Sequence, residues 1–492
     1  MKKDGFTLIE LLAVILILGI IALIAVPTVN SVLNEAKAGS FKATLNNLTK
    51  KIEETCSLEL IKGSKITTFY RVNDGKISPE IELKGDIPNG DIFVNNKCEV
   101  TFELSNNSYV GIKKEDIEIK KCTNGCLEYS EPILNGAKPD IKEGLIPVNI
   151  EDNGVVKIAD IYSKWYSYEE KSWANAILVT DATREKYKTA KAGEPVVQTD
   201  IIGYFVWIPR YKYLIPTSGT STPSTIDIVF ENKFTSVSNG NAKTEYLSHP
   251  AFVFDNNKLN GIWIGKFETT GTKENPTILP NAEILDEQNV KDQFETAISF
   301  NDFGLDDEAA MLKSVEWGSA SYLSHSNYGI NKQIRINNNE SLITGCGSNI
   351  EDARLVKTCD IPYADNRSDY PQSTTGNITG IFDMSGGSWE RMMGVYNNNI
   401  DGTGFTQLPD KKYYETFTTF DYMTSCNGKP CIGHAINETK DWYQDNYYTP
   451  STNYYWICKG AYYNYDTSAG GFAVTSIDGI SYKALSFRTV LR

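Results

Sequence analysis

The sequence predicts an α+β protein in two parts: a long N-terminal helix with a small antiparallel sheet, then a large α+β domain. Three observations support this prediction. An apolar run of helical length lies near the N-terminus, segments of alternating polarity follow it, and a region rich in Trp, Tyr and Asn fills the rest of the 492 residues. A chain of this length has room for two or three domains. We expect a basic leader at 1–5, helix and sheet at 6–130, a linker at 131–154 and the larger domain at 155–492.

The helix is expected to begin in the apolar run Phe6–Val26, which only Thr7 and Glu10 interrupt. About 20 apolar residues are enough to cross a bilayer as a helix. The lysines before the run, Lys2 and Lys3, predict a cytoplasmic N-terminus. A carboxylate inside hydrocarbon is costly, so Glu10 needs a partner there. The run therefore predicts a membrane-inserted helix whose single acid has a specific role.

Beyond the run, the helix is expected to continue to about residue 60, because apolar residues recur there at three- to four-residue spacing. The residues on this face are Leu33, Ala36, Phe41, Leu45, Leu48 and Ile52. A helix of about 55 residues is roughly 80 Å long, so its second half can lie against a globular head. Alternating segments predict the strands of that head. They are 65–72, 91–94, 99–104, 109–113 and 117–120.

Residues 5–10 read Gly-Phe-Thr-Leu-Ile-Glu, which matches the signature of type IV prepilins and pseudopilins without a mismatch. The N-terminus therefore resembles that family. The resemblance implies that a prepilin peptidase cleaves after Gly5 and that the new amino group of Phe6 is methylated. It also implies that Glu10 pairs with the α-amino group of a neighbouring pilin subunit during assembly. Such a pair is physically reasonable, because two opposite charges buried together are tolerated where either alone is not.

Two alternatives explain less of the N-terminus. A secretory signal would carry small residues at a cleavage site after the apolar run, and Ala25-Val26-Pro27 is a poor version of that. A plain membrane anchor explains the length of the run but neither Gly5-Phe6 nor Glu10. The pilin interpretation accounts for all of these features.

Composition narrows the function classes. The net charge is −14 and no long basic block lies outside the leader, which argues against nucleic acid as a main partner. The three histidines, His249, His325 and His434, are scattered without ligand spacing. Histidine-based zinc binding or base catalysis therefore has little to work with.

All nine cysteines lie outside the apolar run, which fits an oxidising compartment. Spacing alone does not fix their connectivity, but close neighbours suggest local disulfides. The predicted pairs are Cys122 with Cys126, Cys346 with Cys359, and Cys426 with Cys431; Cys56 with Cys98 would join the helix to its sheet. Cys458 is then left over.

The larger domain carries a second resemblance, in residues 375–390 and at the C-terminus. Six residues match the pattern Asn-x-x-Gly-x-x-Asp-Met-x-Gly-Asn-x-x-Glu: Asn377, Gly380, Asp383, Met384, Gly386 and Glu390. Gly387 replaces the second Asn, and near the end of the chain Ser486 replaces the Gly before Phe-Arg. The region resembles the C-type-lectin-like fold of formylglycine-generating-enzyme-like (sulfatase-modifying-factor-like) proteins.

We expect Glu390 and Arg488 to form a buried, hydrogen-bonded pair that pins the C-terminus. Asn377, Asp383 and nearby carbonyls are candidate calcium ligands, because such oxygens suit a hard cation. No other metal and no required cofactor is expected.

An enzymatic role is not expected. The enzyme of the resembled family uses two nearby cysteines to bind copper in its C-terminal segment, whereas this chain has only Cys458 there. No Gly-x-Ser-x-Gly elbow occurs either. Recognition is the better interpretation, because the last third is crowded with Tyr and Asn, which suit ligand contact. The candidate ligand-binding residues are Tyr447, Tyr448, Tyr454, Tyr455, Tyr462 and Asn464.

Together these features predict a minor type IV pilin, located at a filament tip, that displays a lectin-like domain for adhesion to a host cell, a surface or a glycan. The alternative is a pseudopilin of a type II-like secretion or DNA-uptake machine with a structural passenger domain. The expected partners are the prepilin peptidase, other pilin subunits, the membrane and the external ligand. The chain is expected first as a single-pass protein of the cell membrane and then outside the cell on the pilus.

Overall fold

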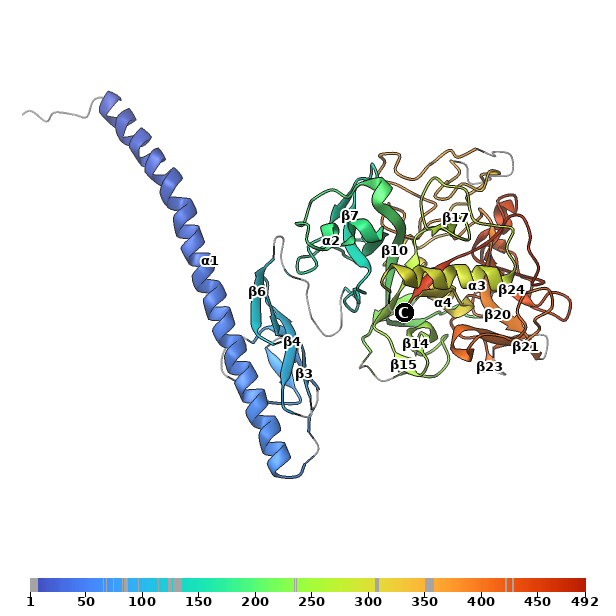
Figure 1. Cartoon of the computed structure of the whole chain (residues 1–492), viewed down its shortest axis with the longest axis horizontal. Helices are drawn as coiled ribbons and strands as arrows, with labels where there is room; N and C mark the ends of the chain where they lie inside the picture. The colour runs from blue at the N-terminus through green and yellow to red at the C-terminus, as the bar shows by residue number, and fades with distance from the viewer. Residues whose placement is uncertain are drawn as a thin grey trace, which may run out of the picture. The chain divides into compact units, whose positions relative to one another are not determined.

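The computed structural model describes residues 8–492, except for 65, 68, 74, 82, 84–86, 96, 114, 123–125, 127–134, 234, 236, 306–308, 350–357, 421–422 and 427–428. The chain forms two compact units. Unit 1 is Met1–Glu131 with Tyr162–Lys164, and unit 2 is Pro132–Ile161 with Trp165–Arg492. Figure 1 shows the elements of each unit.

Unit 1 is one long helix packed against a six-stranded antiparallel sheet. The helix, α1, runs for 54 residues from Leu8 to Ile61, close to the predicted length. The strand order is β2-β1-β3-β4-β5-β6. The strands are β1 (Phe69–Asn73), β2 (Lys76–Ser78), β3 (Asn89–Val94), β4 (Val100–Ser105), β5 (Tyr109–Lys113) and β6 (Ile117–Lys121). Figure 1 shows this sheet lying along the second half of α1.

The predicted apolar face of α1 packs against the sheet in its second half. Phe41, Leu45, Leu48 and Ile52 are buried there, as expected. Leu33 is 51% exposed and Ala36 is also exposed. The sheet reaches back as far as Asn34, whose carbonyl accepts from the hydroxyl of Tyr109 at 3.0 Å.

The apolar run at the start of α1 was expected to cross a membrane. Among the described residues, no helix combines the length and the apolar character that a membrane span requires.

Unit 2 contains a seven-stranded antiparallel sheet in the order β19-β27-β16-β10-β9-β7-β8. Its strands are β7 (Leu145–Ile150), β8 (Val156–Ile158), β9 (Asn175–Val179), β10 (Ile201–Pro209), β16 (Gly261–Gly265), β19 (Ala309–Met311) and β27 (Thr489–Leu491). Every residue of β9, β10 and β16 is buried, which explains why these segments read as continuous apolar runs. The last strand, β27, lies between β19 and β16, so the C-terminus is held inside the sheet.

A second sheet is built around β20, which pairs in parallel with β21 and β26 and antiparallel with β24. Its strands are β20 (Trp389–Tyr396), β21 (Glu415–Phe420), β22 (Met423–Cys426), β23 (Lys429–Pro430), β24 (Trp456–Gly460), β25 (Gly470–Ile477) and β26 (Leu485–Phe487). Smaller ladders join β11 (Tyr211–Leu214) to β12 (Asp227–Phe230) and β13 (Leu247–Ser248), β14 (Val253–Phe254) to β15 (Asn257–Lys258), and β17 (Thr270–Gly271) to β18 (Pro276–Thr277).

The helices of unit 2 are short. They are α2 (Asp181–Lys188), α3 (Val290–Ser299) and α4 (Ser314–Ser324). Single 3₁₀ turns are η1 (Gln198–Asp200), η2 (Pro250–Phe252), η3 (Phe300–Phe303), η4 (Lys411–Tyr413), η5 (Trp442–Gln444) and η6 (Asp466–Ser468).

Helix α4 is buried along its whole length. The indole N–H of Trp317 donates to the carbonyl of Gly471 at 2.8 Å. A Cβ at Gly318 would lie 1.9 Å from the carbonyl oxygen of Gly433, so only glycine allows this close approach. The backbone N–H of Lys313 donates to the Glu316 carboxylate at 2.8 Å, which caps the helix. This cap marks the start of α4, shortly after β19 ends at Met311.

The predicted linker at 131–154 contains a strand of unit 2. Residues 145–150 form β7, which lies between β9 and β8. Before it, the carbonyl of Ala137 accepts from the indole of Trp207 at 3.0 Å, and the carbonyl of Asp140 accepts from that of Trp263 at 2.8 Å. The Pro, Gly and charged residues of this segment suggest a linker, but hydrogen bonds from two buried tryptophans hold its backbone in place.

Three of the predicted disulfides are present: Cys56–Cys98, Cys122–Cys126 and Cys346–Cys359. The first joins α1 to the loop after β3. Cys431 is also disulfide-bonded, whereas the side chain of its expected partner, Cys426, lies outside the described part of the chain. Cys458 is free and buried, as predicted.

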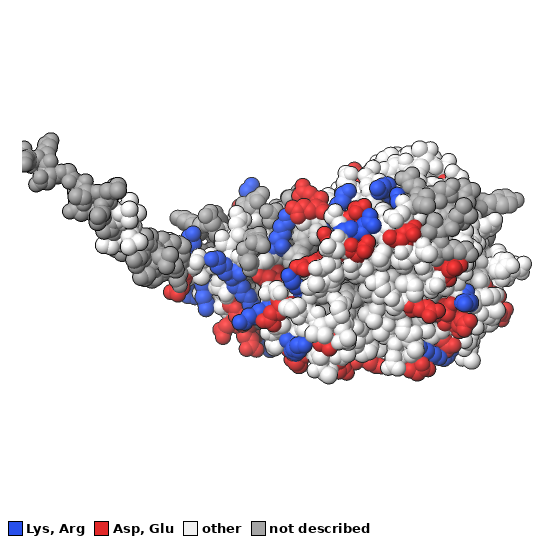
Figure 2. Space-filling view, turned by 90° about the horizontal axis from the view of Figure 1, so that it is seen from above, with Lys and Arg blue, Asp and Glu red and all other residues white. Residues whose placement is uncertain are grey.

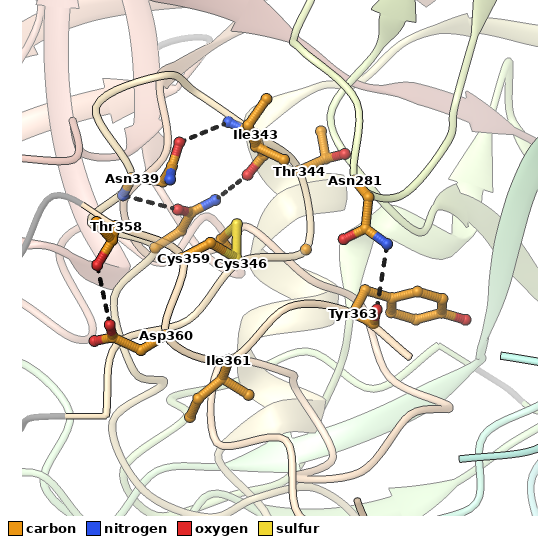
Figure 3. Close-up of a disulfide and its surroundings, with 12 residues drawn as sticks. Asn281, Asn339, Ile343, Thr344, Cys346, Thr358, Cys359, Asp360, Ile361 and Tyr363 are labelled. Atoms are coloured by element: carbon orange, nitrogen blue, oxygen red, sulfur yellow. Dashed lines mark hydrogen bonds between the residues drawn. A yellow bond between two sulfur atoms is a disulfide. The ribbon is translucent and has the colours of Figure 1, made fainter. Parts of the chain in front are cut away.

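The Cys346–Cys359 disulfide closes a loop of unit 2 (Figure 3). Next to it, Gly347 and Ile361 exchange two backbone hydrogen bonds of 2.9 Å, so the covalent and hydrogen-bonded closures reinforce each other.

Replacing Cys346 and Cys359 together by serine is expected to lower the free energy of unfolding of unit 2 by about 3 kcal/mol, the value for a loop of roughly 15 residues. All eight tryptophans lie in unit 2, so urea unfolding followed by tryptophan fluorescence reports on this unit. The matched control is Cys122→Ser with Cys126→Ser in unit 1, which should leave the tryptophan transition in place. Equal shifts from both pairs would contradict the prediction.

Candidate functional site

The N-terminal processing residues lie outside the described part of the chain. This holds for Gly5 and Phe6, whereas Glu10 lies in the first turn of α1 with its side chain outside the described part. Their predicted roles in cleavage, methylation and assembly therefore stay predictions from the motif.

In unit 2 the predicted pair of Glu390 and Arg488 is present and fully buried. Nε of Arg488 donates to one Glu390 oxygen at 2.8 Å, and an Nη donates to the other. The remaining donors reach the carbonyls of Gly265 at 2.8 Å and Phe382 at 3.0 Å. One side chain thus ties β16, β20 and the loop before β20 to the C-terminus.

The charges of this pair support each other. Burial raises the pKa of Glu390, and the guanidinium of Arg488 opposes that rise. Burial by itself lowers the pKa of Arg488, but Glu390, together with the nearby Asp383 and Glu268, outweighs that effect and the pKa lies above its ordinary value. Each partner therefore offsets part of the cost of burying the other, in a place where either charge alone would be unfavourable.

Ser486, which stands where the resembled family has glycine, supports a second buried carboxylate. Its hydroxyl donates to Glu268 at 2.7 Å. The hydroxyl of Ser388 also donates to Glu268 and lies 2.6 Å from the hydroxyl oxygen of Ser486. Burial raises the pKa of Glu268 well above its ordinary value, and the charge of Glu390 adds to that rise.

Gly387, the other departure from the resembled pattern, lies beside the same carboxylate. It has φ +70, and a Cβ there would lie 3.0 Å from Oε2 of Glu268. A larger residue would therefore press on that carboxylate.

The candidate calcium ligands are already engaged by protein groups. The amide oxygen of Asn377 accepts from the backbone N–H of Thr379 at 2.9 Å and from its hydroxyl at 2.7 Å. The carboxylate of Asp383 accepts from the N–H of Gly345 at 2.8 Å and from the amide of Asn337 at 3.0 Å. Each side chain closes its own loop, and the two do not share a hydrogen-bond partner.

The carbonyls beside Asn377 bind a lysine. Nζ of Lys266 donates to the carbonyls of Ile378 at 2.6 Å and Gly380 at 2.9 Å, and to the amide oxygen of Asn175 at 2.9 Å. Three acceptors match the three hydrogens of an ammonium group, although burial lowers the pKa of Lys266 well below its ordinary value. Among the described residues, no group of three or more His, Cys, Asp or Glu side chains is placed to hold a metal ion. Calcium at this loop stays a prediction, with Lys266 already occupying its carbonyls.

The predicted ligand-binding residues differ in their exposure. Tyr448 is 68% and Tyr454 is 56% exposed, and Asn464 is also exposed. Tyr448 donates its backbone N–H to Val474 of β25 at 2.9 Å, and Tyr454 closes a turn just before β24. These residues present aromatic surface beside the β24–β25 hairpin.

Three of the tyrosines are less available. Tyr447 is half-buried and its hydroxyl donates to Asn437 at 3.0 Å. Tyr462 is half-buried in contact with Tyr463, with ring centroids 4.2 Å apart. Tyr455 is only 7% exposed and packs in the core, so the prediction of a ligand contact was wrong for this residue. Alternation along the segment could have placed the ring of Tyr455 inward, opposite to that of Tyr454.

Near these tyrosines the structure adds residues that the sequence did not single out. Ile480 and Tyr482 are exposed in the loop that follows β25. A hollow of about 300 Å³ is lined by Lys332, Arg335 and Tyr443 together with neighbouring backbone and apolar groups. The hydroxyl of Tyr443 lies 2.7 Å from Nε2 of His325 at the C-terminal end of α4.

The class of the N-terminus follows from its motif. It is the motif of type IV pilin- and pseudopilin-like proteins, and it implies processing by a prepilin peptidase and assembly with other pilin subunits. Residues 1–26 match the family model of the prokaryotic N-terminal methylation motif.

Replacing Arg488 by methionine is expected to lower the free energy of unfolding of unit 2 by about 3–5 kcal/mol, because Glu390 stays buried without its partner. The matched control is Arg367→Met, since Arg367 pairs with the exposed Asp369 and such pairs contribute about 0–1 kcal/mol. Urea unfolding followed by tryptophan fluorescence measures both variants. Similar losses from the two variants would rule out a special role for the buried pair.

Proposed function

We propose that this chain is a minor type IV pilin that carries unit 2 as a lectin-like passenger domain for adhesion or receptor recognition. The observation that carries the pilin part is the N-terminal methylation motif at residues 1–26. The long α1 helix with a small sheet on its second half supports it. On this proposal Glu10 pairs with the amino group of a neighbouring subunit, and the chain stays in the cell membrane, N-terminus inside, until it joins the pilus.

The size of unit 2 supports a place at the filament tip. Unit 2 takes up most of the chain, and a passenger of that bulk is hard to repeat along a tightly packed fibre. Helix α1 has an exposed apolar stretch before the sheet, which includes Val29, Val32 and Leu33. Such a stretch is suited to contact with other pilin subunits.

A C-type-lectin-like fold for unit 2 is supported by the positions of three residues that match the family pattern, which are buried and interact with one another. Asp383, Glu390 and Arg488 belong to one buried polar network. A network of this kind holds long loops in fixed positions, and recognition residues commonly lie on such loops. Tyr448 and Tyr454 are the exposed aromatic residues best placed to contact a host cell, a surface or a glycan.

We propose no catalytic role for unit 2. Burial raises the pKa of Cys458 to about 12, so its thiol is not a nucleophile at neutral pH. Burial lowers the pKa of His325 to about 4 and that of His434 to about 3, so both rings are neutral. Their poor basicity makes them weak general bases.

The alternative function is a pseudopilin of a type II-like secretion or DNA-uptake machine with a structural passenger. Figure 2 shows one face of the molecule, on which acidic and basic side chains alternate with wide uncharged areas. A duplex-binding surface usually gathers lysine and arginine on one face. The charge pattern of this face therefore favours a ligand other than DNA.

Replacing Glu10 by leucine is expected to leave cleavage after Gly5 intact and to reduce incorporation into filaments, because the charge partner of the neighbouring amino group is lost. Peptide mapping of sheared filaments measures both, since a processed chain begins at Phe6. A tip adhesin should appear in the sheared fraction in small amounts, whereas a pseudopilin should remain with the membrane. If the variant is incorporated into filaments as well as the wild type is, the proposed role of Glu10 in assembly is wrong.

Replacing Tyr448 and Tyr454 together by alanine is expected to weaken binding of the full-length chain to glycan arrays or intact cells by about tenfold or more, as removal of aromatic anchors does. The control is Val197→Ala, an exposed apolar residue elsewhere in unit 2. Repeating the measurement in EDTA tests whether binding requires calcium. We expect no loss of binding, because Lys266 donates to the carbonyls beside Asn377. Unchanged binding by the double variant would remove these tyrosines from the site.

A further inference from the structure

A hollow of about 860 Å³ lies in unit 2 at the N-terminal end of α4. Small-molecule sites in proteins commonly measure roughly 300–1,000 Å³. The lining comes from the start of α4, from η4 with Tyr414 and Glu415, and from Arg210, residues 237–240 and 247–250, Val253, Asp255, Asn256, Ile432 and His434. Most of its side chains are polar or charged, which suits a hydrated ligand better than an apolar one.

Three lysines line this cavity: Lys313, Lys411 and Lys412. Lys313 is only 9% exposed. Its ammonium donates to the carbonyl of Lys412 at 3.4 Å and lies 3.9 Å from the carboxylate of Glu316. That carboxylate already accepts two hydrogen bonds from Arg492, at 2.6 and 3.0 Å. Lys313 therefore brings a mostly buried ammonium to the cavity wall, where it shares Glu316 with Arg492 and opposes the rise that burial causes in the pKa of Glu415.

The cations gather around one aromatic ring. Measured to the centroid of the Phe254 ring, Nζ of Lys313 lies at 5.5 Å, Nζ of Lys412 at 5.7 Å and Cζ of Arg492 at 4.5 Å. Burial lowers the pKa of Lys411, Glu415 opposes that change, and the like charge of Lys313 adds to it. Like charges this close repel one another, and a bound anion would relieve that repulsion.

The cavity also offers acceptors, which limits the kind of anion that fits. Glu415 is buried in its wall and accepts from the backbone N–H of Val315 at 3.4 Å. Nδ1 of His434 lies 3.7 Å from the Glu415 carboxylate and has no hydrogen-bond partner among the described residues. Asp255 and Asp410 line the cavity as exposed residues. A polyanion would be repelled by these carboxylates, whereas a ligand with one negative group and several hydroxyls can use both sets.

We propose that this cavity binds an acidic saccharide residue, with its carboxylate among Lys313, Lys411 and Lys412 and its hydroxyls on Glu415, Asn239 and Asn256. The inference rests on the proposed recognition function of unit 2 and names its ligand class. Tyr414 lines the same cavity and carries Nζ of Lys411 at 4.0 Å from its ring centroid. Lysine ammonium groups can pair with a carboxylate, and asparagine amides can hydrogen-bond hydroxyls. Together with an aromatic side chain, these groups suit a sugar acid.

The test compares D-glucuronic acid with D-glucose, which differ in the carboxylate at C6, by isothermal titration calorimetry on the full-length chain. Glucuronate is expected to bind at least tenfold more tightly than glucose. The double variant Lys411→Glu with Lys412→Glu should weaken glucuronate binding at least tenfold while keeping the tryptophan unfolding transition. The matched control Lys191→Glu reverses an exposed lysine outside the cavity and should bind as the wild type does.

Three outcomes would overturn the inference: no glucuronate binding, equal binding of glucose, or unchanged binding by the double variant. Inorganic sulfate is a further competitor, and displacement of glucuronate by equimolar sulfate would reduce the cavity to a general anion site and overturn the sugar assignment. Failure here is distinguishable from failure of the proposed function. If the wild-type chain binds cells or glycans but not glucuronate, recognition stands and the cavity assignment falls. Glucuronate binding without binding to cells or glycans would leave the cavity assignment and remove adhesion.

Discussion

The guanidinium of Arg488 is buried a few residues from the C-terminus. Its charge is tolerated only because Nε and both Nη atoms donate hydrogen bonds to acceptors. Glu390 of β20 neutralises it, and carbonyls of β16 and of the loop before β20 accept its other hydrogens. The two large sheets of unit 2 are therefore joined by one side chain. Because breaking such a pair leaves a bare charge in a low dielectric, the arrangement is specific as well as stabilising.

Two further ionisable side chains, Glu268 and Lys266, are buried in unit 2. Glu268 is kept beside Glu390 by the hydroxyls of Ser388 and Ser486, and Lys266 holds the loop carbonyls around residue 378. These groups fix long irregular segments that have few backbone ladders of their own. A scaffold of this kind leaves its remaining loops and cavities free to vary in chemistry, which is what a recognition domain requires.

Local features of the sequence predicted much of the fold. The length of α1, the later strands of unit 1 and the disulfides Cys122–Cys126 and Cys346–Cys359 were predicted correctly, because periodicity and close spacing report on local geometry. The Glu390–Arg488 pair was also predicted, from a motif. The linker at 131–154 was predicted wrongly. Distant partners decided that outcome, because Trp207 and Trp263 hold residues 137–140.

The sequence by itself determined the processing motif at residues 5–10, the long helix that follows it and the residues available for recognition. These depend on neighbours along the chain. Only the tertiary structure decided that Tyr454 is exposed while Tyr455 is buried, and that a lysine fills the carbonyl loop beside Asn377. It also brought His249 and His434, which look scattered in the sequence, into one cavity with three lysines. Such groupings arise from contacts between segments a hundred or more residues apart, and no periodicity or spacing encodes them.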